Sequence, residues 1–136
     1  MKRVLVLGAS GSIGTNAIEV IEDNPDSLKM VGIQVHKNKK LLAKIKKKHG
    51  DIVTATSSED ADDVADFHGP EAIKKLIDTT KPDIVVNGIS GSPGLIPSIQ
   101  TLEAGIDLAL ANKETVVMAG EIIFDLAKAR GASILP

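Results

Sequence analysis

The chain has 136 residues, a length typical of one domain, and 43% of them are hydrophobic, which suffices for an ordinary buried core. Its formal net charge is −2 and its aromatic residues are two phenylalanines, so we expect no nucleic-acid partner, because such binding uses clustered positive charge and aromatic stacking. Cysteine is absent, which excludes disulfides, a thiol nucleophile and cysteine-bound metal, and fits a reducing cytoplasm.

The chain begins with a predicted strand, a tight loop and a predicted helix. The aliphatic run at 4–7 ends at Gly8, and apolar residues then recur at helical spacing over 12–24, where Pro25 disfavours continuation. A run this short is neither a secretory signal nor a membrane span, so we expect a cytoplasmic protein with no membrane partner. A second strand is predicted at 30–35.

The middle of the chain predicts two more helices and two more strands. Helical spacing covers 37–50, which ends in a glycine, and a strand follows at 51–56. The segment 57–66 is rich in carboxylates and poor in apolar residues, which indicates a solvated loop. A helix with proline in its first turn is predicted at 70–80, and a strand at 83–87.

The last part of the chain continues this alternation. A loop at 91–97 opens a helix that ends at 104, a strand follows at 108–110, a long helix spans 114–130, and an apolar triplet lies at 133–135. Strands that alternate with helices predict an α/β fold: a doubly wound, Rossmann-like parallel sheet with right-handed crossovers and helices on both faces. Since no linker is evident, we expect one domain over 1–136.

The sequence GASGSIG stands at 8–14, between the first predicted strand and the first predicted helix. In a dinucleotide site, the first glycine permits a tight turn, the second lets the backbone approach a pyrophosphate, and the third allows close helix packing. Gly8, Gly11 and Gly14 fit these three places, and the backbone amides of 10–13 are predicted to bind the phosphates. A Walker-type loop is excluded because no Lys-Ser or Lys-Thr pair follows. A glycine-rich turn that binds nothing is the alternative.

The end of the second strand distinguishes NADP from NAD. An NAD site places Asp or Glu about 20 residues beyond the glycines to bind the ribose 2′-hydroxyl, but residues 36–40 contain no carboxylate. Cations and amide donors favour a 2′-phosphate, and we expect Lys37 and Asn38 to bind it. His36 is either a further phosphate contact or an ordinary loop residue. The sequence therefore predicts NADPH as the cofactor.

Two further loops lie at the same edge of the predicted sheet, where open α/β sheets bind ligands. Residues 87–94 follow one strand and hold three glycines, which allow close backbone approach. Asn112, Lys113 and Glu114 follow the next strand and offer an amide, an ammonium group and a carboxylate. Plain helix capping explains these three residues as well as a functional role does, and both explanations stay open.

Four segments together resemble the 1-deoxy-D-xylulose 5-phosphate reductoisomerase family. They are GASGSIG at 8–14, ISGSPGLIPSI at 89–99, LALANKETVV at 108–117 and the closing ILP. The resemblance covers nearly all of this chain but only the amino-terminal, NADPH-binding third of the family's enzyme. It implies an enzyme that rearranges and reduces the phosphosugar 1-deoxyxylulose 5-phosphate to 2-C-methylerythritol 4-phosphate, in the non-mevalonate isoprenoid pathway, with NADPH and Mg²⁺ or Mn²⁺.

The resemblance also implies particular roles for residues and a homodimeric enzyme. It implies a substrate contact at Lys113. It implies cofactor contacts at Ser10, Gly11, Ser12, Ile13, His36, Lys37, Asn38, Asn112 and Glu114. The chain departs from the family's pattern at Ser10, where Thr is common, at His36, where Gly is common, and between 56 and 69, where it looks shorter.

No cluster of carboxylates or histidines in this sequence has the spacing of a metal site, so we expect the metal ligands, and the activation of substrate, outside this chain. Two rival functions remain. One is the NADP-binding domain of another dehydrogenase, of the semialdehyde or homoserine type. The other is a nucleotide-sensing module without catalysis.

Overall fold

Within residues 1–59, 65–110 and 113–135, which the computed structural model describes, seven strands form one sheet. Their order is β4-β3-β2-β1-β5-β6-β7, and each neighbouring pair is parallel. The strands are β1 Lys2–Leu7, β2 Leu28–Val35, β3 Val53–Thr56, β4 Phe67–His68, β5 Ile84–Asn87, β6 Asp107–Leu110 and β7 Ile134–Leu135. The helices are α1 Ser12–Asp23, α2 Lys39–His49, α3 Ala72–Thr80, the 3₁₀ turn η1 Ser92–Gly94, α4 Leu95–Glu103 and α5 Lys113–Arg130. The predicted doubly wound α/β fold is confirmed.

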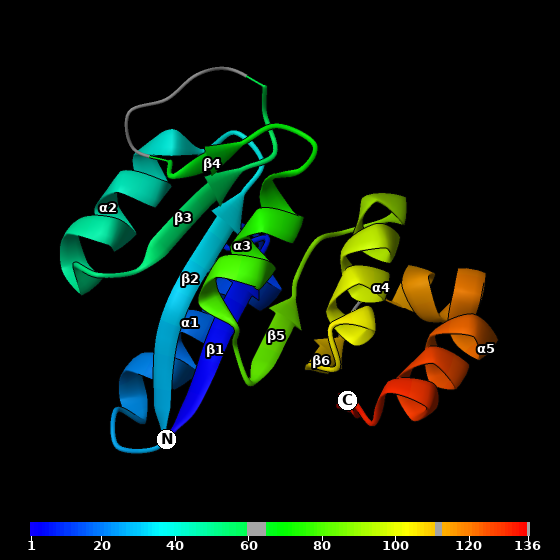
Figure 1. Cartoon of the computed structure of the whole chain (residues 1–136). Helices are drawn as coiled ribbons and strands as arrows, with labels where there is room; N and C mark the ends of the chain where they lie inside the picture. The colour runs from blue at the N-terminus through cyan, green and yellow to red at the C-terminus, as the bar shows by residue number, and fades with distance from the viewer. Residues whose placement is uncertain (60–64, 111–112, 136) are drawn as a thin grey trace.

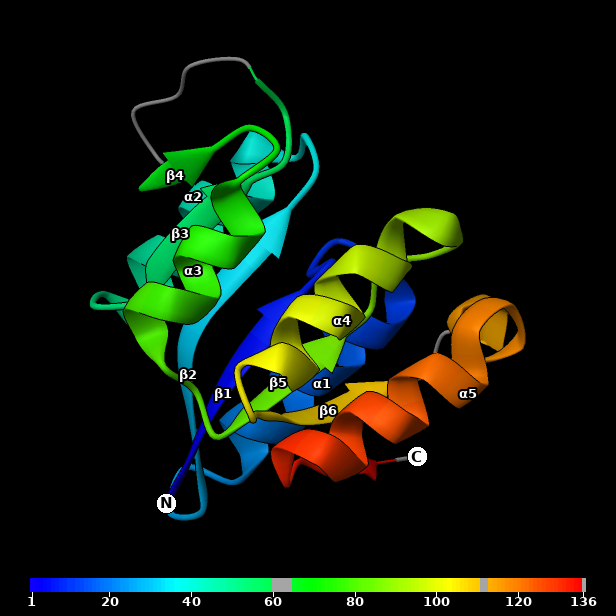
Figure 2. The same cartoon turned by 45° about the vertical axis from the view of Figure 1, so that its right-hand side comes forward.

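Helices cover both faces of the sheet, as predicted (Figures 1 and 2). On one face, α1 and α2 pack on β1 and β2 through an aliphatic cluster that includes Ile18 and Leu42. On the other face, α3 packs on β1, β2 and β3 around Leu5 and Leu76. Helices α4 and α5 pack against each other, and with β6 they enclose Leu102. The core is therefore aliphatic, as a parallel sheet covered on both faces requires.

The strand order reverses beside β1. From β1 the chain runs outward through β2, β3 and β4, and it then returns to β5 on the opposite side of β1. The strands are parallel, so their carboxyl ends meet at one edge of the sheet (Figure 1). The loops after β1 and β5 leave this edge in opposite directions, and the crevice between them is where open α/β sheets bind ligands. The glycine loop lies at this reversal.

Several predicted boundaries are wrong in detail. Helix α3 begins at Ala72, so Pro70 lies in the preceding turn and not in the first turn of the helix. Helix α4 begins at Leu95, and Pro97 lies within its first turn, where a missing amide costs no helical hydrogen bond. Helix α5 is kinked at Ala119, whose φ of −146° and ψ of 25° are not helical, and its spacing predicted no such break.

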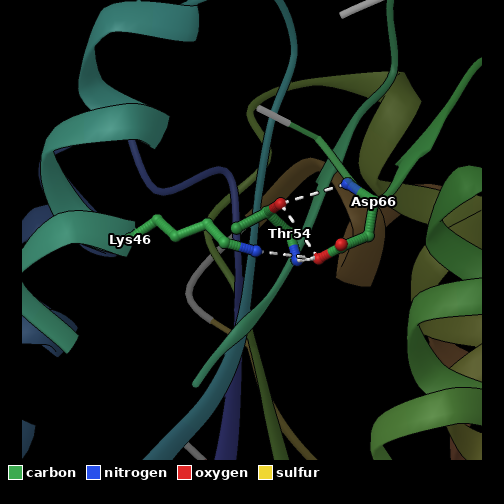
Figure 3. A network of polar contacts seen from close by, with 3 residues as sticks. All are labelled: Lys46, Thr54 and Asp66. Atoms are coloured by element: carbon green, nitrogen blue, oxygen red, sulfur yellow. Dashed lines mark hydrogen bonds and ion pairs between the residues drawn. The ribbon is translucent and has the colours of Figure 1, made fainter. Parts of the chain in front are cut away.

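The segment predicted as a solvated loop at 57–66 is anchored at both ends. Ser58 is buried, and the carboxylate of Asp66 accepts hydrogen bonds from the backbone amide of Thr54 at 2.9 Å and from its hydroxyl at 3.2 Å (Figure 3). Lys46 of α2 lies 3.4 Å from the same carboxylate. These contacts bring the chain alongside β3, where it forms the short strand β4. The prediction missed β4 because two residues are too few to show a period.

Candidate functional site

A cavity of about 420 Å³ opens at the carboxyl edge of the sheet, across the reversal of strand order. Residues that end or follow β1, β2, β3 and β5 line it together with one residue of α3. They are Gly8, Ser10, Gly11, Gln34, His36, Ser57, Gly88, Ile89, Ser90, Pro93 and Ile73. Four of the predicted site residues, Gly8, Ser10, Gly11 and His36, therefore line this cavity.

Two glycines of the loop are required by the backbone itself. Gly8 has a φ of +68°, a left-handed conformation that side chains rarely adopt. At Gly14 a Cβ atom would lie 2.3 Å from the carbonyl oxygen of Gly8, so a side chain there would separate α1 from the loop. These are the roles that the sequence predicted for the first and third glycines, a tight turn and close helix packing.

The middle glycine is different, because the backbone does not require it. Gly11 is exposed and has an extended conformation, with φ −82° and ψ 172°. A Cβ atom there would lie 3.6 Å from its nearest neighbour, the carbonyl oxygen of Gly8, which is an ordinary contact. The fold therefore accommodates a side chain at this position. In a dinucleotide site, a glycine at this place lets the ligand approach the backbone.

The amino end of α1 offers backbone donors next to Gly11. The helix begins at Ser12, has no side-chain cap, and leaves the amides of its first turn without helical acceptors. One expectation is wrong: the amide of Gly11 is not free, because it donates to the carbonyl oxygen of Gly8 at 3.1 Å. The amides of Ser12 and Ile13 lie at the positive end of the helix dipole, which suits an anion.

Lys37 and Asn38, predicted to bind a 2′-phosphate, follow β2 together with His36, whose role the sequence left open, and all three are exposed. His36 lines the cavity, whereas Lys37 and Asn38 lie next along the chain, outside its lining. The side chain of Asn38 caps α2, accepting a hydrogen bond from the amide of Leu41 at 3.1 Å. Capping occupies its oxygen, so the nitrogen is the part of Asn38 that suits a phosphate. No carboxylate stands at 36–38 to repel one.

Sequence reasoning missed two polar residues of the cavity, Gln34 and Ser57. Gln34 is 2% exposed in the interior of β2, and its side-chain oxygen accepts a hydrogen bond from the amide of Gly8 at 2.8 Å. Its nitrogen donates to the hydroxyl of Ser57 at 2.6 Å. The sequence did contain a signal for this contact, because Gln34 is a polar residue inside an otherwise apolar predicted strand. A side-chain amide that is buried in a strand needs hydrogen-bond partners from neighbouring segments.

The loop after β5 is held by a buried asparagine. The side chain of Asn87 donates to the carbonyl oxygen of Gly94 at 2.9 Å and to the hydroxyl of Ser98 at 2.8 Å. Its oxygen accepts from the amide of Ile89 at 3.1 Å. Asn87 is fully buried, and its hydrogen bonds hold the loop 88–94 in place. Ser90 of this loop lines the cavity.

The remaining predicted residues lie after β6. Helix α5 begins at Lys113, which places the backbone of Lys113 and Glu114 at the same sheet edge as the cavity. Their side chains, and the whole of Asn112, lie outside what the structure describes. Among the described residues, no group of three or more His, Cys, Asp or Glu side chains could hold a metal ion. None of the described helices is both long and apolar enough to cross a membrane.

Comparison with known proteins gives one consistent result. A family model described as 1-deoxy-D-xylulose 5-phosphate reductoisomerase matches residues 4–120. The reductoisomerase of Treponema denticola is 42% identical over 135 residues, which cover 99% of this chain and 35% of that protein. A crystal structure of DOX-P reductoisomerase in complex with NADPH, fosmidomycin and magnesium matches with a TM-score of 0.91 at 26% identity, covering 100% of this chain and 36% of that one.

A second solved structure agrees. The 1-deoxy-D-xylulose 5-phosphate reductoisomerase from Zymomonas mobilis in complex with NADPH matches with a TM-score of 0.87 at 28% identity, covering 99% of this chain and 38% of that one. The chain thus spans little more than a third of the proteins that it matches.

Proposed function

This chain belongs to the 1-deoxy-D-xylulose 5-phosphate reductoisomerase family, and we propose that residues 1–136 form the NADPH-binding domain of such an enzyme. The observation that carries the proposal is Gly11. It is exposed and extended, and the fold accommodates a side chain there, beside the unpaired amides of α1 and at the cavity where the strand order reverses. A pyrophosphate that lies against this backbone accounts for these features together.

The residues present fit NADPH in charge and in placement. NADPH supplies a hydride when bound, and the chain supplies the groups that orient it. Ser10, Ser12 and Ile13 offer backbone or hydroxyl donors to the pyrophosphate, with Gly8 and Gly11 shaping the loop. The adenosine 2′-phosphate binds a separate group of residues that follows β2, namely His36, Lys37 and Asn38.

We propose that the complete protein converts 1-deoxy-D-xylulose 5-phosphate to 2-C-methyl-D-erythritol 4-phosphate, with Mg²⁺ or Mn²⁺, in isoprenoid biosynthesis. One solved relative holds NADPH, magnesium and fosmidomycin together, which supports a metal and a small phosphosugar ligand. In this proposal Lys113 contacts the substrate, and Asn112 and Glu114 contact the cofactor. The support is their match to the family's ANKE motif and the start of α5 at the edge of the sheet that bears the cavity.

The rival dehydrogenase, of the semialdehyde or homoserine type, is not favoured, because the reductoisomerase family model matches most of the chain. The rival module without catalysis makes a different prediction: the complete protein would bind NADPH and oxidise none with 1-deoxy-D-xylulose 5-phosphate.

The direct test is affinity for nicotinamide dinucleotides. Titration calorimetry of the purified chain at low salt should show NADPH binding more tightly than NADH, because the 2′-phosphate gains the contacts at 36–38. Tighter binding of NADH would refute the assignment of the cofactor.

We also propose a cytoplasmic homodimer. The absence of cysteine supports a reducing compartment. Exposed apolar side chains on α5, among them Val117, Met118 and Phe124, support contact with further protein. Sedimentation of the complete protein at several concentrations tests the dimer: a mass of one chain throughout would exclude it.

A further inference from the structure

A single buried side chain joins two loops of the cavity. Gln34 accepts from the amide of Gly8 at 2.8 Å and donates to the hydroxyl of Ser57 at 2.6 Å, although these partners lie 26 and 23 residues away in the chain. The register of β2 with its neighbours brings them together, since Gln34 pairs with Leu7 of β1 on one side and with Ala55 of β3 on the other. Gln34 therefore links the loops after β1 and β3 at the wall of the cavity.

The direction of both hydrogen bonds follows from chemistry. A backbone amide can only donate, so the atom of Gln34 that faces Gly8 must be its oxygen, and its nitrogen then faces Ser57. The hydroxyl of Ser57 thus accepts from Gln34. Its own hydrogen must point elsewhere, and among the described residues no acceptor for it is found. Ser57 lines the cavity and is half-buried, so this hydrogen is available to a ligand.

We propose that Gln34 is a positioning residue, and that it holds the hydroxyl of Ser57 as a hydrogen-bond donor to the adenosine half of the dinucleotide. This rests on the proposed function. The pyrophosphate belongs at the amino end of α1 and the adenosine ribose beyond the end of β2. Ser57 follows β3, which lies on the far side of β2 from β1, and the amide of Ser57 donates to the carbonyl oxygen of Val35 at 3.1 Å. It is therefore next to the adenosine and away from the nicotinamide.

The experiment measures binding of NADPH and of 2′,5′-ADP, a probe that keeps the phosphorylated adenosine and lacks the nicotinamide half. Ser57→Ala should weaken both ligands by the same factor, about three- to tenfold, the worth of one neutral hydrogen bond. Ser57→Thr retains a hydroxyl and should restore the affinity. Ser27→Ala removes an exposed serine before β2, at the opposite end of the strand, and serves as the matched control.

The coupling to Gln34 is tested by a double-mutant cycle. Gln34→Leu should weaken 2′,5′-ADP at least as much as Ser57→Ala does. In the Ser57→Ala background, Gln34→Leu should reduce the affinity for 2′,5′-ADP by a clearly smaller factor, because the hydroxyl that Gln34 positions is already absent. A role confined to stability would lower the melting temperature and leave the two effects on affinity additive.

Two results would overturn the inference while NADPH still binds the parent chain: unchanged 2′,5′-ADP affinity in Ser57→Ala, or additive effects in the cycle. Absence of NADPH binding by the parent chain would instead overturn the proposed function.

Discussion

At the scale of single residues, the glycine loop contains positions where the fold requires glycine and one where it does not. Gly14 cannot accept a Cβ atom, whereas Gly11 can. We predict that Gly11→Val abolishes NADPH binding measured by calorimetry, because the side chain would occupy the place of the pyrophosphate. The chain should still unfold cooperatively, with a stability loss of about 1 kcal/mol, since valine is a poorer helix cap than glycine.

The matched variant is Gly14→Ala. Its methyl group would meet the carbonyl oxygen of Gly8 at 2.3 Å, so the loss should appear as a much lower melting temperature. Unchanged NADPH affinity in Gly11→Val would remove the loop from the proposed site.

The second prediction at this scale concerns the choice of nucleotide. Lys37→Glu should weaken NADPH roughly tenfold or more, the worth of a hydrogen bond to a charged group, and should affect NADH much less. The control is Lys47→Glu, an exposed lysine of α2 that brings the same change of charge. Equal losses for NADPH and NADH would mean that Lys37 acts through the general field of the protein and not on the 2′-phosphate. Added salt should shrink the effect.

At the scale of elements, the carboxylate of Glu22 forms ion pairs that connect the last turn of α1 to the last turn of α2. Glu22 accepts from Lys48 at 2.7 Å and contacts His49 at 3.1 Å. The hydrogen bond from Lys48 holds the pKa of Glu22 below its ordinary value of 4.5, with a smaller contribution from His49 and some opposition from burial. A lowered pKa stabilises the fold above the pKa of the unfolded chain, and this stability is lost as pH falls through the lower folded value.

We predict that Glu22→Gln lowers the free energy of unfolding at neutral pH by about 1 kcal/mol or less, because the pair is partly exposed. The deficit should disappear as pH falls below about 4.5, where the parent loses the same contribution. Urea unfolding at several pH values measures it, with Glu19→Gln on the exposed side of α1 as the control. A deficit that is constant with pH would assign the effect to packing.

At the scale of the whole molecule, binding and turnover are predicted to separate. The chain covers 36% of the solved relative that holds both NADPH and magnesium. We predict that the 136-residue polypeptide binds NADPH, less tightly than a complete enzyme, and shows no Mg²⁺- or Mn²⁺-dependent NADPH oxidation with 1-deoxy-D-xylulose 5-phosphate. Absorbance of NADPH at saturating metal and substrate measures this, with a complete reductoisomerase as the positive control. Metal-dependent turnover by the 136-residue chain would contradict the prediction.

The last prediction applies to a complete protein that contains this sequence. Lys113→Ala should lower kcat/KM for 1-deoxy-D-xylulose 5-phosphate roughly ten- to hundredfold, the cost of one charge-assisted contact. NADPH affinity should stay nearly unchanged, because the proposed partner of Lys113 is the substrate. Normal kinetics in this variant would remove Lys113 from the site.

The sequence by itself determined the order of most elements and the class of the fold, because hydrophobic periods, glycines and prolines act over a few neighbouring residues. It also determined the glycine loop as a candidate phosphate site and the lack of a carboxylate after β2. The same local signals placed Pro70 inside a helix and left out β4, since a two-residue strand exists only through its pairing with β3.

Only the tertiary structure decided how the candidate residues are held. It showed that the fold can accommodate a Cβ atom at Gly11 but not at Gly14. The difference depends on which backbone atoms a Cβ at each position would contact. It also showed that Gln34 joins Gly8 to Ser57, and no local pattern contains that link. Such contacts follow from the register and order of parallel strands, which bring distant positions to one sheet edge only after the sheet has formed.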